Sequence, residues 1–260
     1  AGKLTARQLD LLLLNLGALP TSPEAAEILI DLACRKAWEP LLQAVQKNPA
    51  VTLRLLKLAN QRQSGVYCLE QAVQIIGQEG VFSVCLSTEM LPKDQIGLDL
   101  CGFQAHSQAV ALVAEKIVRQ FSLPIDPRLA YTCGLLHDIG KLLIARLLPK
   151  SYRRTIDDAQ AHQGNIAEFE RTLIGLDHMS VGRRLLQYWK LDTLLQQTVW
   201  MHHLPVKALP VDMENPQLAG VISLADALVR KGNIGFSGNY VFPLSPEGIA
   251  QSLGLDATQL

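Results

Sequence analysis

The sequence predicts a mostly α-helical protein, on three observations. Apolar residues recur at steps of three and four, which is the period of one helix face. Pro follows Ser or Asn at several positions that suit a helix start, because Pro is tolerated at the first helical residue. No segment alternates convincingly between apolar and polar residues, and the best strand candidate, residues 234–242, is short and rich in Gly. The clearest periodic sets are Leu41, Leu42, Val45 and Val51, Leu55, Leu58, and the starts with Pro are Ser22-Pro23, Asn48-Pro49 and Ser245-Pro246.

The first helix is predicted to be amphipathic. Basic residues Lys3 and Arg7 precede four consecutive leucines, which faintly resembles a signal peptide. Asp10 and Asn15 bracket that apolar run, however, and Leu residues at 4, 9, 12 and 16 fit one helical stripe. No stretch of the chain reaches the roughly 18 uninterrupted apolar residues of a membrane helix.

Composition excludes several classes of protein. The 260 residues are 48% hydrophobic and 18% charged, so the chain has ample apolar side chain to bury and disorder is excluded as the dominant state. Lys plus Arg number 24 and Asp plus Glu number 24, which gives a net charge of zero. A general binder of nucleic acid or of anionic membranes normally carries a basic excess, so neither class is expected.

Cysteine usage favours a reducing compartment. The five cysteines are odd in number and no pair has C-x-x-C spacing, so a disulfide framework is not expected and a cytoplasmic location is predicted. They are Cys34, Cys68, Cys85, Cys101 and Cys133.

Two halves are suggested by the distribution of histidine. Residues 1–98 contain none, whereas residues 99–260 contain all six. The segment Leu91–Leu100, with its Pro, Asp and Gly, is predicted to be the junction, and the absence of a long polar linker predicts that the halves pack together. A new helix start at Ser245 shortly before the end leaves a continuation of the natural chain past Leu260 open.

Histidine and aspartate gather on apolar helix faces in the second half. One of these residues alone is usually a core side chain with a hydrogen-bond partner. Together they would be costly to bury unless they are paired or bind a metal, and a mixed nitrogen and oxygen donor set suits Fe, Mn, Zn, Co or Ni. The set comprises His106, His137-Asp138, Asp177-His178, His202-His203 and Asp226.

The order His106, His137-Asp138, Asp226 resembles the H…HD…D signature of the HD phosphohydrolase superfamily. Further short matches resemble the HDOD family: Asn48-Pro49-Ala50, residues 55–60 (LLKLAN), residues 72–77 (AVQIIG), residues 134–140 (GLLHDIG), residues 177–182 (DHMSVG) and residues 202–205 (HHLP). This resemblance covers roughly residues 15–255. It implies an all-α fold, with an N-terminal helical subdomain (1–98) and an HD-like helical bundle ending in a C-terminal helix (99–260). It also implies a bacterial signalling protein of unproven catalytic activity.

The related HD-GYP family of cyclic-di-GMP phosphodiesterases uses a two-metal version of such a site. By this resemblance the metal ligands are His106, His137, Asp138, His178, His202, His203 and Asp226, and Lys141 matches the lysine of H-D-x-G-K. Two departures stand out. Gly102 occupies a position where some members have a Glu ligand, and residues 204–207 (LPVK) replace the Gly-Tyr-Pro motif that recognises substrate. Hydrolysis of cyclic-di-GMP is therefore not expected.

Three functions follow from this pattern. The first is a non-catalytic signalling module that binds a protein partner or a small phosphate-containing ligand. The second is a metal-dependent phosphohydrolase acting on a nucleotide or phosphate ester, in which Asp138 bridges two metal ions and Lys141 steadies the phosphate charge. The third is a metal-binding sensor without turnover. The metal (Fe, Mn, Ni or Zn) is not determined by the sequence, and an empty site is compatible with the first function.

Two other polar residues have simpler interpretations. His162 lies in a polar stretch and is predicted to be solvated, at a loop or helix end. Asn60, on a helix face, is predicted to bond a neighbouring backbone segment and fix a helix junction.

Trp38, Trp189 and Trp200 are interpreted as packing residues, although Trp200 lies close enough to His202 in sequence to suggest a wall of the site.

Overall fold

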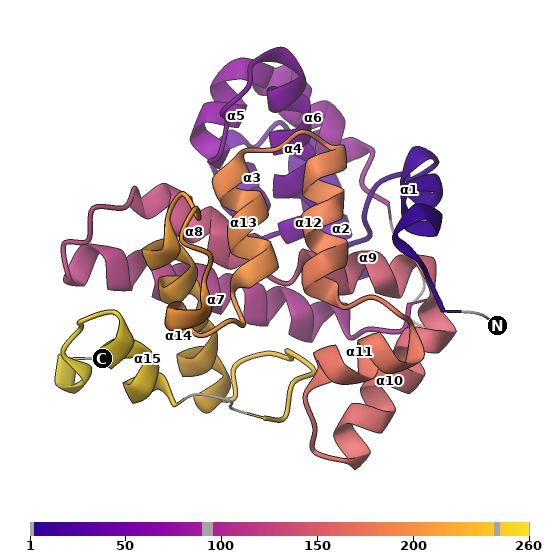
Figure 1. Cartoon of the computed structure of the whole chain (residues 1–260). Helices are drawn as coiled ribbons and strands as arrows, with labels where there is room; N and C mark the ends of the chain where they lie inside the picture. Colours follow the sequence, from indigo (N-terminus) through magenta and orange to yellow (C-terminus); the bar gives the residue numbers. More distant parts are fainter. Residues whose placement is uncertain (1–2, 90–95, 242–244, 260) are drawn as a thin grey trace.

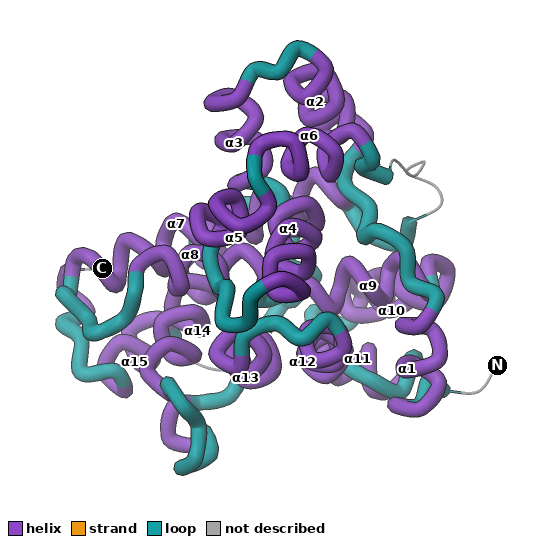
Figure 2. Tube along the Cα trace, turned by 90° about the horizontal axis from the view of Figure 1, so that it is seen from above, coloured by secondary structure: helices purple, strands orange, loops and turns teal. Residues whose placement is uncertain are grey.

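A computed structural model describes residues 3–89, 96–241 and 245–259 of the chain. The prediction of an all-α fold is confirmed: helices joined by short turns make up the structure, and the described residues contain no strand (Figures 1 and 2). Residues 234–241 of the strand candidate form a loop, and Phe242 lies outside the described residues. Within these ranges, no helix combines the length and the apolar character needed to cross a bilayer.

The described residues of the first half form six helices. Their starts follow the predicted signals, since the side chains of Ser22 and Asn48 each accept a hydrogen bond from the backbone three residues on, ahead of Pro23 and Pro49. The helices are α1 (Ala6–Leu14), α2 (Pro23–Cys34), α3 (Trp38–Gln46), α4 (Pro49–Arg62), α5 (Leu69–Ile76) and α6 (Gln78–Leu86).

Asn60 fixes the end of α4 as predicted. Its Nδ2 donates to the carbonyl oxygens of Leu56 (2.9 Å) and Val66 (2.7 Å), and its Oδ1 accepts from the Val66 N–H at 3.2 Å. The amide thereby satisfies both backbone groups of Val66 in the turn that leads to α5.

The second half is a bundle around α7, the longest helix, which crosses the centre of Figure 1. Helices α8 and α14 pack on α7, and α9 and α13 pack on α12. The elements are α7 (Leu100–Gln120), α8 (Pro127–Leu136), α9 (Ile139–Leu147), α10 (Pro149–Ala161), α11 (Ile166–Leu173), α12 (His178–Tyr188), α13 (Thr193–Met201), η2 (Val206–Ala208), α14 (Pro216–Lys231), α15 (Pro246–Ser252) and η3 (Ala257–Gln259).

One continuous hydrophobic core joins the two halves. Helix α1 reaches across to the second half, where the Leu4 N–H donates to the Ile174 carbonyl at 2.6 Å and Arg184 pairs with Asp10 (Figure 1). Residues 91–95 of the predicted junction (Leu91–Leu100) lie outside the described residues, and a boundary at 98/99 stays a prediction. The five cysteines are free thiols.

A close helix contact brings the turn after α8 against α12. A Cβ on Gly140 would lie 1.9 Å from the His178 carbonyl oxygen and 2.8 Å from the Gly182 nitrogen. Only a glycine therefore allows α9 to approach the first turn of α12 this closely. The consequence is that His178 lies beside the turn that carries Asp138.

Candidate metal centre

The seven predicted ligands come from five places in the bundle and gather in two adjacent groups. His106 lies in the middle of α7, and Asp226 lies in α14. His137 and Asp138 form the tight turn between α8 and α9. His178 begins α12, and the pair His202-His203 follows α13. Side-chain donor atoms fall into two groups, each with all members within 4.8 Å of one another: Asp138, His178, His202, His203, and His106, His137, Asp226.

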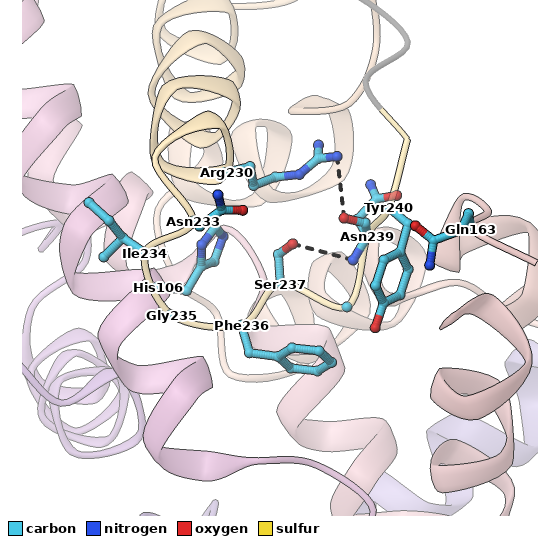
Figure 3. Close-up of a pocket in the computed structure, with 11 residues that line it drawn as sticks. His106, Gln163, Arg230, Asn233, Ile234, Gly235, Phe236, Ser237, Asn239 and Tyr240 are labelled. Atoms are coloured by element: carbon cyan, nitrogen blue, oxygen red, sulfur yellow. Dashed lines mark hydrogen bonds between the residues drawn. The ribbon is translucent and has the colours of Figure 1, made fainter. Parts of the chain in front are cut away.

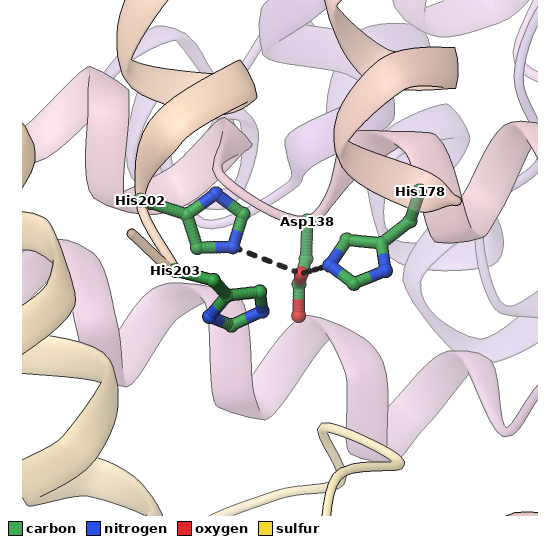
Figure 4. Close-up of side chains that lie close together, drawn as sticks. All are labelled: Asp138, His178, His202 and His203. Carbon is green, nitrogen blue, oxygen red and sulfur yellow. Dashed lines mark ion pairs between the residues drawn. The ribbon is translucent and has the colours of Figure 1, made fainter. Parts of the chain in front are cut away.

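Asp138 lies between the two groups. Its Oδ1 is 3.4 Å from His178 Nε2 and 3.6 Å from His202 Nε2 (Figure 4). Its Oδ2 is 3.3 Å from His137 Nε2 and 4.0 Å from His106 Nε2. The two oxygens of one carboxylate thus face different groups, which is the arrangement a bridging ligand needs.

Asp226 completes the second group. Its Oδ1 is 3.1 Å from His106 Nε2 and 4.0 Å from His137 Nε2. Burial raises the pKa of Asp226, but the hydrogen bond and charge of His106 outweigh burial and hold the pKa well below its ordinary range. This carboxyl group is therefore ionised at neutral pH and can act as an oxygen ligand.

Backbone and side-chain acceptors orient three histidines. The Nδ1 atoms of His137 and His202 lie 2.7 Å and 2.9 Å from the carbonyl oxygens of Gly134 and Val199. Since a carbonyl oxygen only accepts, each Nδ1 carries a proton, and Nε2 is the nitrogen that offers a lone pair when the ring is neutral. His178 Nδ1 lies 2.6 Å from Glu170 Oε2 and is oriented in the same sense. Histidines that bind metals are typically held in this way through their second nitrogen.

Glu170 is a residue that sequence reasoning missed. Its fully buried carboxylate accepts from the His178 backbone N–H at 2.8 Å, from His178 Nδ1 and from the Tyr152 hydroxyl at 3.1 Å. The sequence contains a signal for this residue, because Glu170 lies four residues after Ile166 and four before Ile174, on an apolar helix stripe. A carboxylate buried on such a stripe requires hydrogen-bond partners. Burial and the Glu170 carboxylate raise the pKa of Tyr152 well above its usual value, so its hydroxyl stays a donor.

Lys141 is buried, with 1% of its surface exposed. Its Nζ donates to Asp138 Oδ2 at 2.5 Å and to the Ser237 carbonyl at 2.7 Å. Burial raises the pKa of Asp138, but His137 and Lys141 outweigh burial and keep the pKa well below its ordinary value. The ammonium group of Lys141 thus compensates the negative charge of Asp138. A contact between Lys141 and a phosphate stays a prediction.

The loop after α14 covers the centre at α7. The Phe236 N–H donates to the Gly102 carbonyl at 2.9 Å. Gly235, at φ +69°, lies so close to α7 that a Cβ on it would be 2.3 Å from the backbone nitrogen of His106. A Cβ on Gly102 would lie 2.8 Å from the Cβ of Phe236. The loop therefore occupies the space that a Glu side chain at position 102 would need.

The donor set fits a divalent metal ion. The Nε2 atoms of His137, His178 and His202 are buried and have no hydrogen-bond partner in the described structure, and neither does Asp138 Oδ1. Unpartnered buried nitrogens are costly unless something coordinates them. Burial lowers the pKa of His202 and of His203, so their rings are neutral near pH 7, which metal binding requires. No cysteine belongs to either donor group within the described residues.

Two residues lie outside this centre. His162 caps the end of α10 and is exposed, as predicted, with its Nδ1 2.8 Å from the Asp158 carbonyl oxygen. Trp200 packs against Met201 and lies under Arg183, whose guanidinium carbon is 3.6 Å from the ring centroid. A role of Trp200 as a wall of the site stays a prediction.

Comparisons with known proteins agree with this architecture. Among solved structures, the chain is similar to the MmoQ response regulator of Methylococcus capsulatus (24% identity, TM-score 0.72, 92% of this chain and 95% of that chain). It is also similar to an HDOD domain protein of unknown function from Geobacter sulfurreducens (21%, 0.56, 95% and 87%) and to a provisionally named phosphohydrolase from Shewanella amazonensis (23%, 0.52, 95% and 88%). At these identities the likeness concerns the fold alone. Curated proteins include no match to the chain. A family model described as the HDOD domain matches residues 19–205, and the chain belongs to the HDOD family.

Proposed function

We propose that this chain is a regulatory module of a bacterial signalling pathway, and that it holds one or two divalent metal ions without turning over a substrate. The observation that carries the proposal is the convergence of unpartnered Nε2 atoms on the two oxygens of Asp138. The five free thiols support a cytoplasmic setting, where cysteines stay reduced.

Each metal would have its own donor group. One would be held by His106, His137 and Asp226, and the other by His178, His202 and His203, with Asp138 shared between them. Imidazole and carboxylate donors without thiolates suit Fe, Mn, Ni or Zn. The buried acceptors behind His137, His178 and His202 would keep these rings aimed at the ions.

The enclosure of the centre supports binding without turnover. The side chains of His106, His137, Asp138, His178, His202 and Asp226 are between 0 and 4% exposed, and His203 is partly buried. A catalytic metal keeps an open coordination position that substrate can reach. Here Lys141 and the backbone of residues 235–237 lie against the centre, with Lys141 bonded to both Asp138 and Ser237. A second protein, bound at the surface, would then receive the signal.

The second candidate is a metal-dependent phosphohydrolase. The bridging position of Asp138 between two donor groups and the ammonium group of Lys141 beside it favour this candidate. Bound metals would lower the pKa of a coordinated water and polarise a phosphoryl oxygen. Lys141 would then have to leave Asp138, or share it, in order to contact a phosphate.

Elemental analysis of the full chain, purified without chelator, tests the proposal. We expect about one or two equivalents of metal per chain. His178→Ala is expected to lower that content, and His162→Ala, which removes an exposed histidine outside the centre, is the matched control. Equal metal content in both variants, or none in the parent after reconstitution with each ion, would contradict a metal centre.

Assays of the metal-loaded chain separate the two candidates. Hydrolysis of nucleotides, phosphomonoesters and phosphodiesters should remain at background for a regulatory module. Turnover that disappears in Asp138→Asn and persists in His162→Ala would replace the regulatory proposal with the phosphohydrolase.

A further inference from the structure

A polar cavity of about 290 Å³ lies against the outer side of the metal centre (Figure 3). The loop after α14 forms most of its wall, and α7, the end of α14 and the turn after α10 contribute the rest. The residues that matter to its chemistry are His106, Arg230, Asn233, Ser237, Asn239 and Tyr240.

The lining is rich in hydrogen-bond donors and carries a positive charge. Arg230 provides a guanidinium group whose side chain is only 7% exposed, and the other groups are amides and hydroxyls. None of the described lining residues is a carboxylate. Asp226 lies outside the lining and pairs with Arg230 at 3.4 Å, whereas the lining itself offers the guanidinium group with amides and hydroxyls. A guanidinium group of this kind is suited to a planar carboxylate or a phosphate.

Arg230 is held at the cavity wall by groups of the protein. It lies 3.4 Å from Asp226 Oδ2 and 3.5 Å from the Asn239 carbonyl, and it also donates to the Val241 carbonyl. These contacts fix the guanidinium group of a lining residue before a ligand enters, so little further ordering is needed when it binds an oxyanion.

Two residues that line the cavity each contain a polar atom without a partner among the described residues. His106 Nδ1 and Asn239 Oδ1 are buried and have no hydrogen-bond partner among the described residues. His106 is 1% exposed, and it is the centre's one histidine on α7. In contrast, the Nδ1 atoms of His137, His178 and His202 have protein acceptors. A molecule in the cavity would supply the partner that the protein does not supply to His106.

The cavity wall is anchored at three places. Lys141 donates to the Ser237 carbonyl at 2.7 Å, the Phe236 N–H donates to the Gly102 carbonyl, and the Tyr240 N–H donates to the Gly164 carbonyl at 3.3 Å. A preformed cavity requires little ordering when a ligand enters, so little of the binding free energy is lost.

We propose that this cavity binds a small organic oxyanion, a phosphate ester or carboxylate that also carries hydroxyl groups, as a regulatory ligand. Arg230 would bind the oxyanion, while the amides and His106 would bind the remaining polar groups. The volume exceeds that of an inorganic phosphate ion and lies just below the range of drug-sized pockets, which indicates a molecule no larger than a mononucleotide.

The ligand would be coupled to the metal centre. His106 and Arg230 line the cavity and also contact Asp226, at 3.1 Å and 3.4 Å. A change at either residue on ligand binding alters the surroundings of a predicted metal ligand, and by linkage the metal changes ligand affinity by the same factor. Only this coupling rests on the proposed function; binding itself depends on the cavity alone.

Isothermal titration calorimetry of the full chain tests the proposal, with the metal content of each sample measured beforehand. The anionic probes are inorganic phosphate, AMP and malate, and adenosine and glycerol are the uncharged controls. We expect saturable binding of AMP or malate with a Kd below about 1 mM, and weaker binding of inorganic phosphate. The AMP and malate arms distinguish a phosphate ester from a carboxylate.

Three variants locate the binding. Arg230→Gln should weaken binding about 10-fold or more, because it removes the charged donor. Asn239→Ala removes an amide whose Oδ1 has no described partner, so the fold is retained, and it should weaken binding about 3-fold or more. Gln187→Ala, an exposed amide outside the lining, is the control and should bind as the parent does.

The outcomes separate this inference from the proposed function. Anion binding that depends on Arg230 and Asn239 supports the cavity site even in a chain without metal. A folded, metal-loaded chain that gives no saturable binding with any anion overturns the cavity site and leaves the metal centre intact. Binding that is equal in Asn239→Ala, Arg230→Gln and the parent also overturns it.

Discussion

The two halves of this molecule differ in the polar groups that they bury. The buried polar side chains of α1–α6 and their loops are neutral: Thr21, Ser22, Asn48, Thr52 and Asn60. The bundle of α7–α14 buries neutral groups as well, namely Ser107, Thr132, Thr155 and Thr198. It also buries charged or titratable groups: His106, His137, Asp138, Lys141, Glu170, Asp177, His178, His202 and Asp226.

Hydrogen-bond satisfaction separates the two regions further. Asn48 and Asn60 each bond to backbone or to a neighbouring hydroxyl, so they serve to fix turns and helix starts. In the bundle, the nitrogens of His137, His178 and His202 that face Asp138 have no described partner. Burial of a polar group thus indicates function only where satisfaction within the protein is incomplete. The following predictions test that contrast.

The largest effect is expected from removing Asp138. Asp138→Ala leaves Lys141 buried without its carboxylate, at a cost of about 3–5 kcal/mol in the free energy of unfolding. Metal content should fall to background, because both donor groups face this residue. Urea unfolding and elemental analysis of the same preparation measure the two effects.

A double variant separates charge balance from metal binding. Asp138→Ala combined with Lys141→Met removes the whole ion pair, so most of the lost stability should return. Metal content should not return. Asp138→Ala could instead lower the free energy of unfolding by about 1 kcal/mol or less and leave metal binding intact. The buried charges of the bundle would then have the same structural role as the neutral polar groups of the N-terminal helices.

Most helices, and the helix positions of the buried histidines and aspartates, can be predicted from the sequence, because they depend on the spacing of apolar residues along the chain. The steps of three and four in Val51, Leu55 and Leu58 predict α4, and all seven donors of the centre lie on helix faces or ends that periodicity identifies. What periodicity cannot supply is the pairing of segments that are distant in sequence.

Three contacts illustrate that limit. Glu170 reaches His178 only because the turn after α11 folds back, and Lys141 reaches Ser237 across 96 residues. The loop of residues 234–241 belongs to the best strand candidate, which its glycines argue against, and its packing on Gly102 is a tertiary contact that no local pattern predicts. Such contacts are set by helix packing and not by the local pattern.

The next effect concerns the support behind the centre. Glu170→Gln keeps the shape of the side chain but faces the donors of His178 with an amide that accepts at one atom only. We expect a loss of about 2–3 kcal/mol in stability and a 10–100-fold weaker metal affinity, measured by competition with a chromogenic chelator.

Tyr152→Phe is the control for Glu170. It removes one hydroxyl that donates to the same carboxylate, so stability should fall by about 1 kcal/mol and metal affinity should stay within a few-fold. Equal metal affinity in Glu170→Gln and the parent would show that Glu170 supports the fold and does not orient His178.

A smaller effect, on stability alone, is expected in the N-terminal half. Asn60→Ala leaves the N–H and C=O of Val66 without their partner, which costs about 2 kcal/mol. Metal content should equal that of the parent, and Gln61→Ala, an exposed neighbour, should change neither quantity. A fall in metal content in Asn60→Ala would mean that the halves are coupled more strongly than their separate chemistry suggests.

The smallest effect lies where the halves meet, at Asp126. This carboxylate caps α8, pairs with Arg128 at 2.7 Å and accepts from the Tyr67 hydroxyl of the N-terminal half at 2.9 Å. The hydrogen bond from Arg128 is the main cause that lowers the pKa of Asp126 to about 2, below its ordinary 3.8. The unfolded chain therefore takes up the proton first as pH falls. The stabilisation is complete above about pH 4 and is lost as pH falls toward 2.

Asp126→Asn keeps the helix cap and removes the charge, so it isolates this contribution. At pH 7 we expect a loss of at most about 1 kcal/mol, because the pair with Arg128 is partly exposed and screened by solvent. The difference between variant and parent in urea unfolding should shrink between pH 4 and pH 2, while other carboxylates titrate equally in both chains. A difference that stays constant over this range would assign the effect to the geometry of the cap and not to its charge. Metal content should be unaffected, because Asp126 is bonded to Tyr67 and Arg128 and belongs to neither donor group of the centre.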